Sequence, residues 1–218
     1  MKALQERAKA TRASIIAGAA LIFDEHGYGG TSLAQVAEAS GVTKGALYFH
    51  FPSKDDLAAA IVAEQNRVVW ESSEKIFAEG HSMLGTMILA TQSFGLNLVH
   101  LPVVRAGVRL TTESTAYGTR VVEPYQDWIS TMADLTARAR DRGEVSQSVD
   151  PEAFGRYLVS SLSGVQMLSN LLTSRADVMQ RICDMWAILL PGVLADPSEE
   201  NVQALLSVTS PVVNAYPG

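Results

Sequence analysis

The stretch from Leu33 to Leu57 constrains the fold most strongly, because it has the pattern of two short helices separated by a tight turn. Leu33, Val36 and Ala37 follow the i, i+3, i+4 spacing of one buried helix face, and apolar residues continue beyond the turn. Gly41 supplies the backbone freedom that a tight turn needs. The pattern predicts a helix-turn-helix motif, whose second helix enters the major groove of DNA.

Polar residues at the expected helix ends support this interpretation. Ser32 and Gln35 have the spacing of a capping box at the start of the first short helix, and Thr43 can cap the second. Ser53 then opens a third helix, which we expect to run to about Gly80. The motif would therefore be followed by a long helix that leads away from it.

A helix presented to DNA needs small residues for close approach and hydrogen-bond donors for phosphate. Lys44 can meet a guanine edge or a phosphate, and both are DNA roles. Thr31 and Ser32 can hold a phosphate at a helix N-terminus, or they can simply cap the helix. The predicted DNA contacts are Thr31, Ser32, Thr43, Lys44, Gly45, Ala46, Tyr48, His50 and Lys54.

These residues resemble a known family. The run from Val42 to Leu57, preceded by an apolar helix and a glycine, is similar to the DNA-binding domain of TetR-type bacterial transcription regulators. The resemblance covers roughly residues 9–60. It implies that Tyr48 and His50 contact backbone phosphates, although the tyrosine ring could pack in the head and the histidine could cap.

Two phenylalanines of this segment, Phe49 and Phe51, are expected in the hydrophobic core. Lys9 and Arg12, near the start of the preceding helix, could touch phosphate or could face solvent. The resemblance further implies that the helix from Ser53 connects the head to a sensor domain and transmits a ligand signal.

The charge distribution is compatible with DNA binding although the 218-residue chain has a net charge of −6. Residues 1–54 carry six basic and four acidic side chains, a net charge of +2, whereas the rest of the chain carries −8. Positive charge is thus concentrated where a phosphate backbone would be met. With 47% hydrophobic residues the chain can bury a sizeable core.

The single cysteine, Cys183, cannot form an internal disulfide, and four scattered histidines lack metal-ligand spacing. We expect no metal, no cofactor and a cytoplasmic location. An apolar run of about 18 residues would be needed to cross a bilayer, and we expect neither a membrane partner nor an export signal.

Helical periodicity continues through the chain, with no credible strand pair, so the predicted fold class is all-α. We expect a three-helix DNA-binding head over residues 1–52 and a helical ligand-binding and dimerisation domain over residues 53–218. Pro191 and Gly192 are expected to end one helix, and Asp196 to cap the last. The other predicted helices cover residues 7–27, 83–100, 103–112, 125–142, 151–174, 177–190 and 197–208.

A second resemblance concerns the middle of the chain. The segment Leu101–Leu110, the helix of Trp128 and the segment Asp184–Leu189 are similar to the γ-butyrolactone receptor subgroup of the TetR-type regulators. These regulators bind small, mostly apolar lactones, butenolides or furans and control antibiotic biosynthesis. The resemblance implies that Trp128 lines or covers a ligand pocket and that Gln65 offers a polar contact. The alternative is that Trp128 is ordinary core.

An apolar pocket with few polar anchors is also compatible with the residue types of the middle helices, and ordinary core is again the alternative. Arg105 and Arg109, four residues apart and next to Glu113, are expected to form structural ion pairs rather than ligand clamps. The hydroxyls of Ser160, Ser161 and Ser163 are candidate anchors, without a choice among them. The predicted ligand contacts are Gln65, Leu89, Phe94, Val108, Leu110, Trp128, Ser160 and Ser161.

The helices at about 151–174 and 177–190 carry more apolar and small surface than one chain can cover. We expect them, with Trp186, to form a two-fold dimer interface, and intramolecular core is the alternative. Two heads about 34–36 Å apart can then bind successive major-groove faces of a pseudo-palindrome.

The sequence therefore predicts a homodimeric, ligand-responsive repressor whose partners are double-stranded operator DNA and a small signalling molecule. A drug-sensing regulator of an efflux pump is the alternative within the family. An enzyme is not expected, because the sequence contains no nucleophile elbow, phosphate loop, metal cluster or paired Cys/His arrangement.

Overall fold

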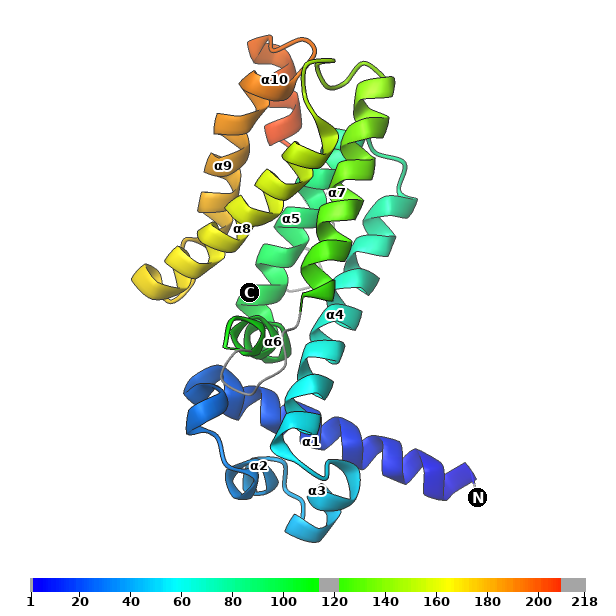
Figure 1. Cartoon of the computed structure of the whole chain (residues 1–218), viewed down its shortest axis with the longest axis vertical. Helices are drawn as coiled ribbons and strands as arrows, with labels where there is room; N and C mark the ends of the chain where they lie inside the picture. Colours follow the sequence, from blue (N-terminus) through cyan, green and yellow to red (C-terminus); the bar gives the residue numbers. More distant parts are fainter. Residues whose placement is uncertain (1, 114–121, 209–218) are drawn as a thin grey trace. The chain divides into compact units, whose positions relative to one another are not determined.

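The computed structural model describes residues 2–113 and 122–208, and in these ranges the chain is built of helices, as predicted (Figure 1). Within the described ranges the β-structure consists of one isolated bridge, between Val145 and Leu194. No single helix among them is both long and apolar enough to cross a membrane. The helices are α1 (Lys2–Gly30), α2 (Leu33–Ala39), α3 (Lys44–His50), α4 (Lys54–Ala78), α5 (Met83–His100), α6 (Pro102–Thr112), α7 (Glu123–Asp141), α8 (Pro151–Thr173), α9 (Val178–Val193) and α10 (Glu199–Leu206).

The chain forms two compact units, each described by itself. The first unit comprises residues 1–69 and 101–121, and the second comprises residues 70–100 and 122–218. Helix α6 belongs to the first unit although it follows α5 in the sequence, and α4 contributes to both. The functional boundary predicted at residue 52 stays a prediction, because these units are defined by compactness.

The first unit has one hydrophobic core, to which α1, α2, α3, the start of α4 and α6 all contribute. One face of α1 is apolar and buried in this core, and α6 packs along α1. This core explains why α6 belongs to the first unit, because two of its side chains are fully buried there. The residues that fill the centre are Ile15, Ala19, Phe23, Val36, Leu47, Leu57, Ile61, Ala106 and Leu110.

The second unit is organised around α5, which is buried along almost its whole length. Helices α7 and α9 pack against α5, and α8 packs against α7 and α9. Trp186 of α9 is 1% exposed, and its indole N–H donates to the Thr91 hydroxyl at 2.8 Å. The prediction that Trp186 lies on a dimer surface is therefore wrong. Trp186 lies on the buried face of α9, and the Thr91 hydroxyl provides the hydrogen-bond partner that its indole N–H needs when buried.

The caps predicted at Ser32 and Thr43 are confirmed, and a further cap opens α8. Gln35 N–H donates to the Ser32 hydroxyl at 3.3 Å, and Ser32 N–H donates to the Gln35 side chain at 2.9 Å, which completes the capping box. The Thr43 hydroxyl accepts from the Ala46 N–H at 3.2 Å, at the start of α3. The Asp150 carboxylate accepts from the Ala153 N–H at 2.7 Å, at the start of α8.

Helix α9 continues through Pro191 to Val193, so the predicted stop at Pro191 is wrong. Pro191 has no N–H donor of its own, but the helical bonding continues after it, and the Leu194 N–H donates to the Leu190 carbonyl at 3.0 Å. The Val193 carbonyl accepts from the Ser146 N–H at 2.9 Å, which satisfies the end of the helix from a neighbouring segment.

The cap of α10 is also different from the prediction. Ser198, rather than Asp196, is the N-cap residue, and its hydroxyl accepts from the Asn201 N–H at 3.4 Å. Asp196 instead accepts from the Ser198 N–H at 3.2 Å. Pro197 therefore precedes the helix instead of occupying its first turn.

Candidate nucleic-acid interface and sensor site

Helix α3 presents an open face on the first unit. Leu47 is its one buried residue, whereas Lys44, Gly45 and Tyr48 are exposed and Ala46 is half-buried. The helix has seven residues, so a single buried anchor leaves most of its circumference available. Gly41 has a φ of 65°, which confirms the need for glycine in the turn before it.

Phe49 is 80% exposed, so the prediction that it belongs to the core is wrong. Successive residues of an α-helix are about 100° apart, which places a side chain two positions after Leu47 on the opposite side of α3. His50 is half-buried and lies edge-on to the Phe49 ring, with centroids 5.2 Å apart. Phe51 is 2% exposed, as predicted, and the Arg12 guanidinium lies 5.1 Å from its ring centroid.

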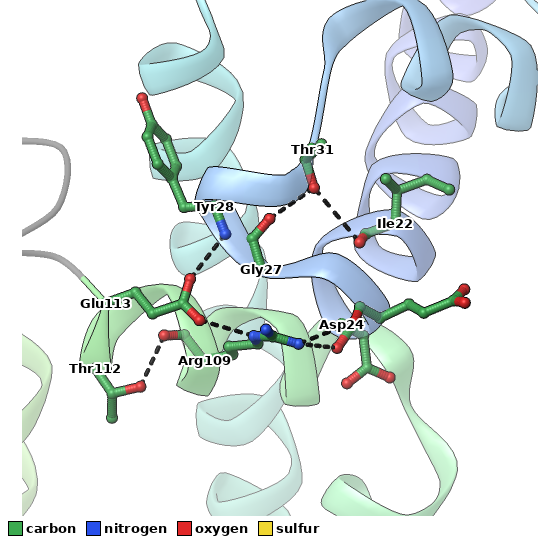
Figure 2. A network of polar contacts seen from close by, with 9 residues as sticks. Ile22, Asp24, Gly27, Tyr28, Thr31, Arg109, Thr112 and Glu113 are labelled. Carbon is green, nitrogen blue, oxygen red and sulfur yellow. Dashed lines mark hydrogen bonds and ion pairs between the residues drawn. The ribbon is translucent and has the colours of Figure 1, made fainter.

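Two residues predicted to contact DNA are bonded inside the chain. Thr31 is 4% exposed, and its hydroxyl donates to the Gly27 carbonyl at 2.7 Å (Figure 2). The Lys54 ammonium donates to the Tyr28 and Thr31 carbonyls at 2.7 and 3.0 Å and lies 4.1 Å from the Tyr28 ring centroid. In this geometry both side chains support the α1–α2 connection from within, and they do not face an open surface as Lys44 does.

The surface of the first unit around Arg12 carries both basic and acidic side chains, and they line a hollow. The hollow has a volume of about 320 Å³ and is lined by residues of α1, by Val103 and by Glu64. Arg67 holds the Glu64 carboxylate at 2.6 Å, and this hydrogen bond lowers the pKa of Glu64 against the effect of burial. Lys9 lies 3.8 Å from Glu6. The phosphate contacts predicted for Lys9 and Arg12 stay predictions.

Helix α6 is bonded to α1 by two arginines, as the prediction of structural ion pairs requires. Arg105 Nε lies 2.6 Å from the Asp24 carboxylate, and Arg109 Nε lies 2.8 Å from the Glu113 carboxylate. Figure 2 shows Arg109 and Glu113 pointing together at the chain between Asp24 and Tyr28. Burial raises the pKa of Glu113, but hydrogen bonds from Arg109 and from the Tyr28 N–H outweigh it and hold this pKa below its usual value.

Three of the predicted ligand contacts lie in the first unit. Gln65 is buried on α4, and α6 approaches it at Gly107, where an added Cβ would lie 2.5 Å from the Gln65 Cβ. Leu110 is fully buried in the core of this unit, and Val108 is half-buried. Gln65 therefore packs on the backbone of α6, and Leu110 acts as core in this structure.

The other five predicted contacts lie in the second unit. Trp128 is half-buried and stacks on Trp70 of α4, with ring centroids 4.5 Å apart and planes 11° from parallel. Leu89 is fully buried, and Phe94 is half-buried. Sequence reasoning missed Trp70, whose only signal was an aromatic residue beside the apolar stripe of the long helix.

The three candidate serines of α8 do not stand out as polar anchors. Ser160 is exposed, and its hydroxyl donates to the Arg156 carbonyl at 2.7 Å within the same helix. Ser161 is half-buried. The Ser163 hydroxyl donates to the Val159 carbonyl at 2.8 Å, again within α8. Which serine meets a ligand stays open.

Two polar atoms of α5 are buried without a hydrogen-bond partner among the described residues, the Ser93 hydroxyl and the Asn97 side-chain carbonyl. The Asn97 amide nitrogen bonds to the Ser72 hydroxyl at 3.4 Å. Ser93 and Asn97 are one helical turn apart on one face of α5. A buried polar atom without a partner is costly, so these two atoms are candidates for contact with a polar group of a ligand.

Within residues 2–113 and 122–208, no group of three or more histidine, cysteine, aspartate or glutamate side chains has the arrangement of a metal site.

Two family models match this chain. The model for bacterial regulatory proteins of the tetR family matches residues 15–61, which include α2 and α3. The model for the C-terminal domain of tetracyclin-repressor-like proteins matches residues 81–195. Between them, the two models match parts of both compact units.

The chain is similar to the A-factor receptor protein of Streptomyces griseus, with 36% identity over 191 residues. The match covers 88% of this chain and 66% of that receptor, so the chain spans just under two thirds of the receptor's length.

Solved structures show the same similarity over almost the whole chain. A structure described as the molecular basis for control of antibiotic production by bacterial hormones has 36% identity and a TM-score of 0.79, and covers 85% of this chain and 98% of its own. A γ-butyrolactone receptor (ArpA-like protein) has 32% identity, a TM-score of 0.77 and coverages of 93% and 96%. The protein CprB from Streptomyces coelicolor, in complex with its operator sequence, has the same four values.

Proposed function

The chain belongs to the tetR family of bacterial regulatory proteins, and on that premise we propose that it is a homodimeric, ligand-responsive transcriptional repressor. It binds a pseudo-palindromic operator and is released by a small, mostly apolar signal of the γ-butyrolactone, butenolide or furan type. Its targets are genes of antibiotic or other secondary-metabolite biosynthesis. The observation that carries the proposal is the open face of α3, where Lys44, Gly45 and Tyr48 are exposed behind a capped turn.

In this proposal α3 enters the major groove, and the small residues Gly45 and Ala46 allow close approach. Lys44 meets a guanine edge or a phosphate, and Tyr48 and His50 donate to phosphates. Ser32 and Thr43 lie at helix N-termini, where free N–H groups favour an anion. Phe49 joins these residues, since an exposed ring on such a helix can contact a thymine methyl group.

Thr31 and Lys54 have supporting roles in the proposal. Their polar groups are bonded to the backbone between residues 27 and 31, so they hold the start of α2 in place for Ser32. A direct phosphate contact by either side chain would require these hydrogen bonds to break.

The dimer forms through α8 and α9. Large apolar side chains on these helices are exposed in the single chain, and burial of such a surface is the main driving force of association. A two-fold dimer places two α3 helices for two half-sites of one operator. The exposed residues are Tyr157, Met167, Leu168, Leu171, Leu172 and Ile188.

The sensor site lies in the second unit, where the stacked rings of Trp70 and Trp128 form an aromatic wall for the flat ring of a lactone or furan. Ser93 and Asn97 supply the polar contacts: the serine hydroxyl donates to a ligand carbonyl, and the asparagine carbonyl accepts from a ligand hydroxyl. This ligand class is supported by the similarity to a γ-butyrolactone receptor and to the A-factor receptor.

A ligand can release the operator only through its difference in affinity for two conformations of the dimer. Helix α4 carries both Lys54, which supports the α1–α2 connection, and Trp70, which contacts the sensor residue Trp128. A useful switch needs about 1–3 kcal/mol of coupling between ligand and DNA. Displacement of α4 by the ligand is the step that supplies it.

The proposal is tested by selecting an operator from random double-stranded DNA with the purified protein, followed by a release assay. We expect a pseudo-palindrome to be selected and to be released by γ-butyrolactones, butenolides or furans. Release by diverse cationic or aromatic drugs, with no effect of lactones, would establish the efflux-type regulator instead. If no DNA sequence is enriched, the repressor proposal fails.

A further inference from the structure

The connection between α1 and α2 depends on one residue with a non-helical backbone. Gly27 has φ 68° and ψ −175°, so helix α1 kinks there before it reaches Gly30. Helix α2 starts six residues after Gly27, at Leu33 with its cap Ser32. The direction of the capped end of α2 therefore depends on how this kink is held.

At the kink, Arg109 of α6 and Glu113, its C-cap residue, bond to the backbone of α1. The Tyr28 N–H donates to Glu113 Oε2 at 2.7 Å. Arg109 Nη1 donates to the carbonyls of Asp24 and Glu25 at 2.8 and 3.1 Å. Figure 2 shows these partners around the kink.

Arg109 and Glu113 also hold each other, with Nε and Oε1 2.8 Å apart. The pair thus provides an acceptor for the Tyr28 N–H and donors for the carbonyls of Asp24 and Glu25. A surface pair spaced by four residues contributes little by itself. The bonds to the backbone of another helix distinguish this pair from the similarly spaced Arg138–Asp134 pair of α7.

The Arg109 and Glu113 side chains lie so close to Gly27 that a larger residue at this position would collide with them. A Cβ added to Gly27 would lie 2.7 Å from Arg109 Nη2 and 2.7 Å from Glu113 Oε1. The Gly27 carbonyl accepts from the Thr31 hydroxyl, and Lys54 of α4 bonds the Thr31 carbonyl. The start of α2 is therefore fixed from α6 through the pair and from α4 through Lys54.

We propose that Arg109 and Glu113 are positioning residues for DNA binding, which clamp the α1 kink and so set the direction of α2 and α3 without touching DNA. The inference rests on the proposed repressor function. It assigns to α6 a direct hold on the DNA-binding head in addition to the packing of Leu110 and Ala106 in the core.

The test compares Glu113→Ala, Glu113→Gln and Arg109→Ala with the control Arg138→Ala, which breaks a pair of the same spacing on α7. Operator affinity is measured by fluorescence anisotropy, and Tyr28 amide exchange by NMR. Residues that act on a site without contacting its ligand change affinity by about 2- to 30-fold, and we expect Glu113→Ala and Arg109→Ala to weaken operator binding by a factor in this range.

Tyr28 amide exchange should accelerate in Glu113→Ala. Glu113→Gln should recover much of both losses, because its side-chain carbonyl still accepts from Tyr28. Arg138→Ala should change neither quantity. Gly27→Ala provides a second way to displace the clamp, and it should reduce operator affinity with Arg109 and Glu113 unchanged.

The clamp is overturned if wild-type protein binds its operator and the Glu113→Ala and Arg109→Ala proteins, folded by circular dichroism, bind it equally well. It is also overturned if Glu113→Gln is as defective as Glu113→Ala while Tyr28 exchange stays unchanged in both. If the wild-type protein selects no operator, the proposed repressor function is wrong. In that case Tyr28 amide exchange still tests the Arg109–Glu113 clamp, which is rejected if Glu113→Ala exchanges at the wild-type rate.

Discussion

Trp128 of α7 lies flat against Trp70 of α4, with 4.5 Å between the ring centroids and 11° between the ring planes. Each indole limits the positions open to the other, because both are half-buried and stacked. In the proposed function this pair is the aromatic wall of the sensor site. It also links α7 to the helix that begins at the DNA-binding head.

Replacing Trp128 with alanine should leave operator binding intact and abolish release of the operator by lactone.

Replacing Trp70 with alanine should weaken lactone affinity by up to about tenfold. The stacked pair contributes about 0.5–1.5 kcal/mol, and without Trp70 the Trp128 ring would become ordered only when the ligand binds. Calorimetric titration with a lactone measures this. The control is Trp186→Phe, which alters the buried hydrogen bond to Thr91 and should lower thermal stability but not lactone affinity. If lactone still releases the operator from Trp128→Ala, Trp128 is a core residue and does not contact the ligand.

Phe49 and Phe51 should respond in opposite ways to alanine substitution. Phe49→Ala should change the free energy of unfolding by no more than about 0.5 kcal/mol, since the ring is exposed, but should weaken operator binding. Phe51→Ala should cost about 3–5 kcal/mol, because it empties a buried ring position. Urea unfolding and operator anisotropy measure the two effects. A Phe49→Ala protein with full operator affinity would remove this residue from the DNA interface.

A charge on the exposed apolar surface of α8 or α9 should prevent dimerisation without unfolding the chain. Leu171 and Ile188 are 75% and 78% exposed in the single chain, and Leu171→Glu and Ile188→Glu each place an unpaired carboxylate in the proposed interface. Sedimentation velocity should show monomers with wild-type helix content. Leu21→Glu on α1 is the control and should remain dimeric. Persistence of the dimer in both variants would exclude this surface as the interface.

Asp177 should make stability depend on acid pH. Hydrogen bonds from the hydroxyls of Ser169 and Thr173, and then from Arg181, lower the pKa of Asp177 from 3.8 to about 2. A carboxyl whose pKa is lower in the folded state stabilises the protein above its unfolded pKa, and this contribution is lost as the pH falls toward the folded pKa. Asp177→Asn should therefore destabilise at pH 7 and flatten the loss of stability between about pH 4 and pH 2. Thermal unfolding across this range measures it, and an identical pH profile in wild type and variant would contradict the assignment.

Local signals predicted the framework of the DNA-binding head well. The capping box of Ser32 and Gln35, the cap Thr43 and the turn at Gly41 depend on residues within a few positions of one another. Such interactions are readable from spacing alone, since no distant segment competes for the same groups. The exposure of Phe49 could have been predicted by the same rule, because it lies two positions after the buried Leu47.

The roles of several other residues could not be predicted, because they depend on partners that are distant in the sequence. Lys54 and Thr31 have residue types that suit phosphate, but carbonyls of the α1–α2 connection take their donors. Helix α9 continues through Pro191, and the carbonyl of its last residue accepts from Ser146, which is far away in the sequence. Trp70 carried no local signal for its stacking on Trp128. These choices depend on which segments meet in space.

The central claim is that one protein binds an operator and a lactone-type signal, and that each weakens the other. The most direct measurement is calorimetric titration of a γ-butyrolactone into the free dimer and into the dimer saturated with its selected operator. We predict that the ligand binds the operator complex about 5–150-fold more weakly than the free dimer, because coupling between two ligands is reciprocal. Equal affinity for the two forms would contradict a ligand-responsive repressor.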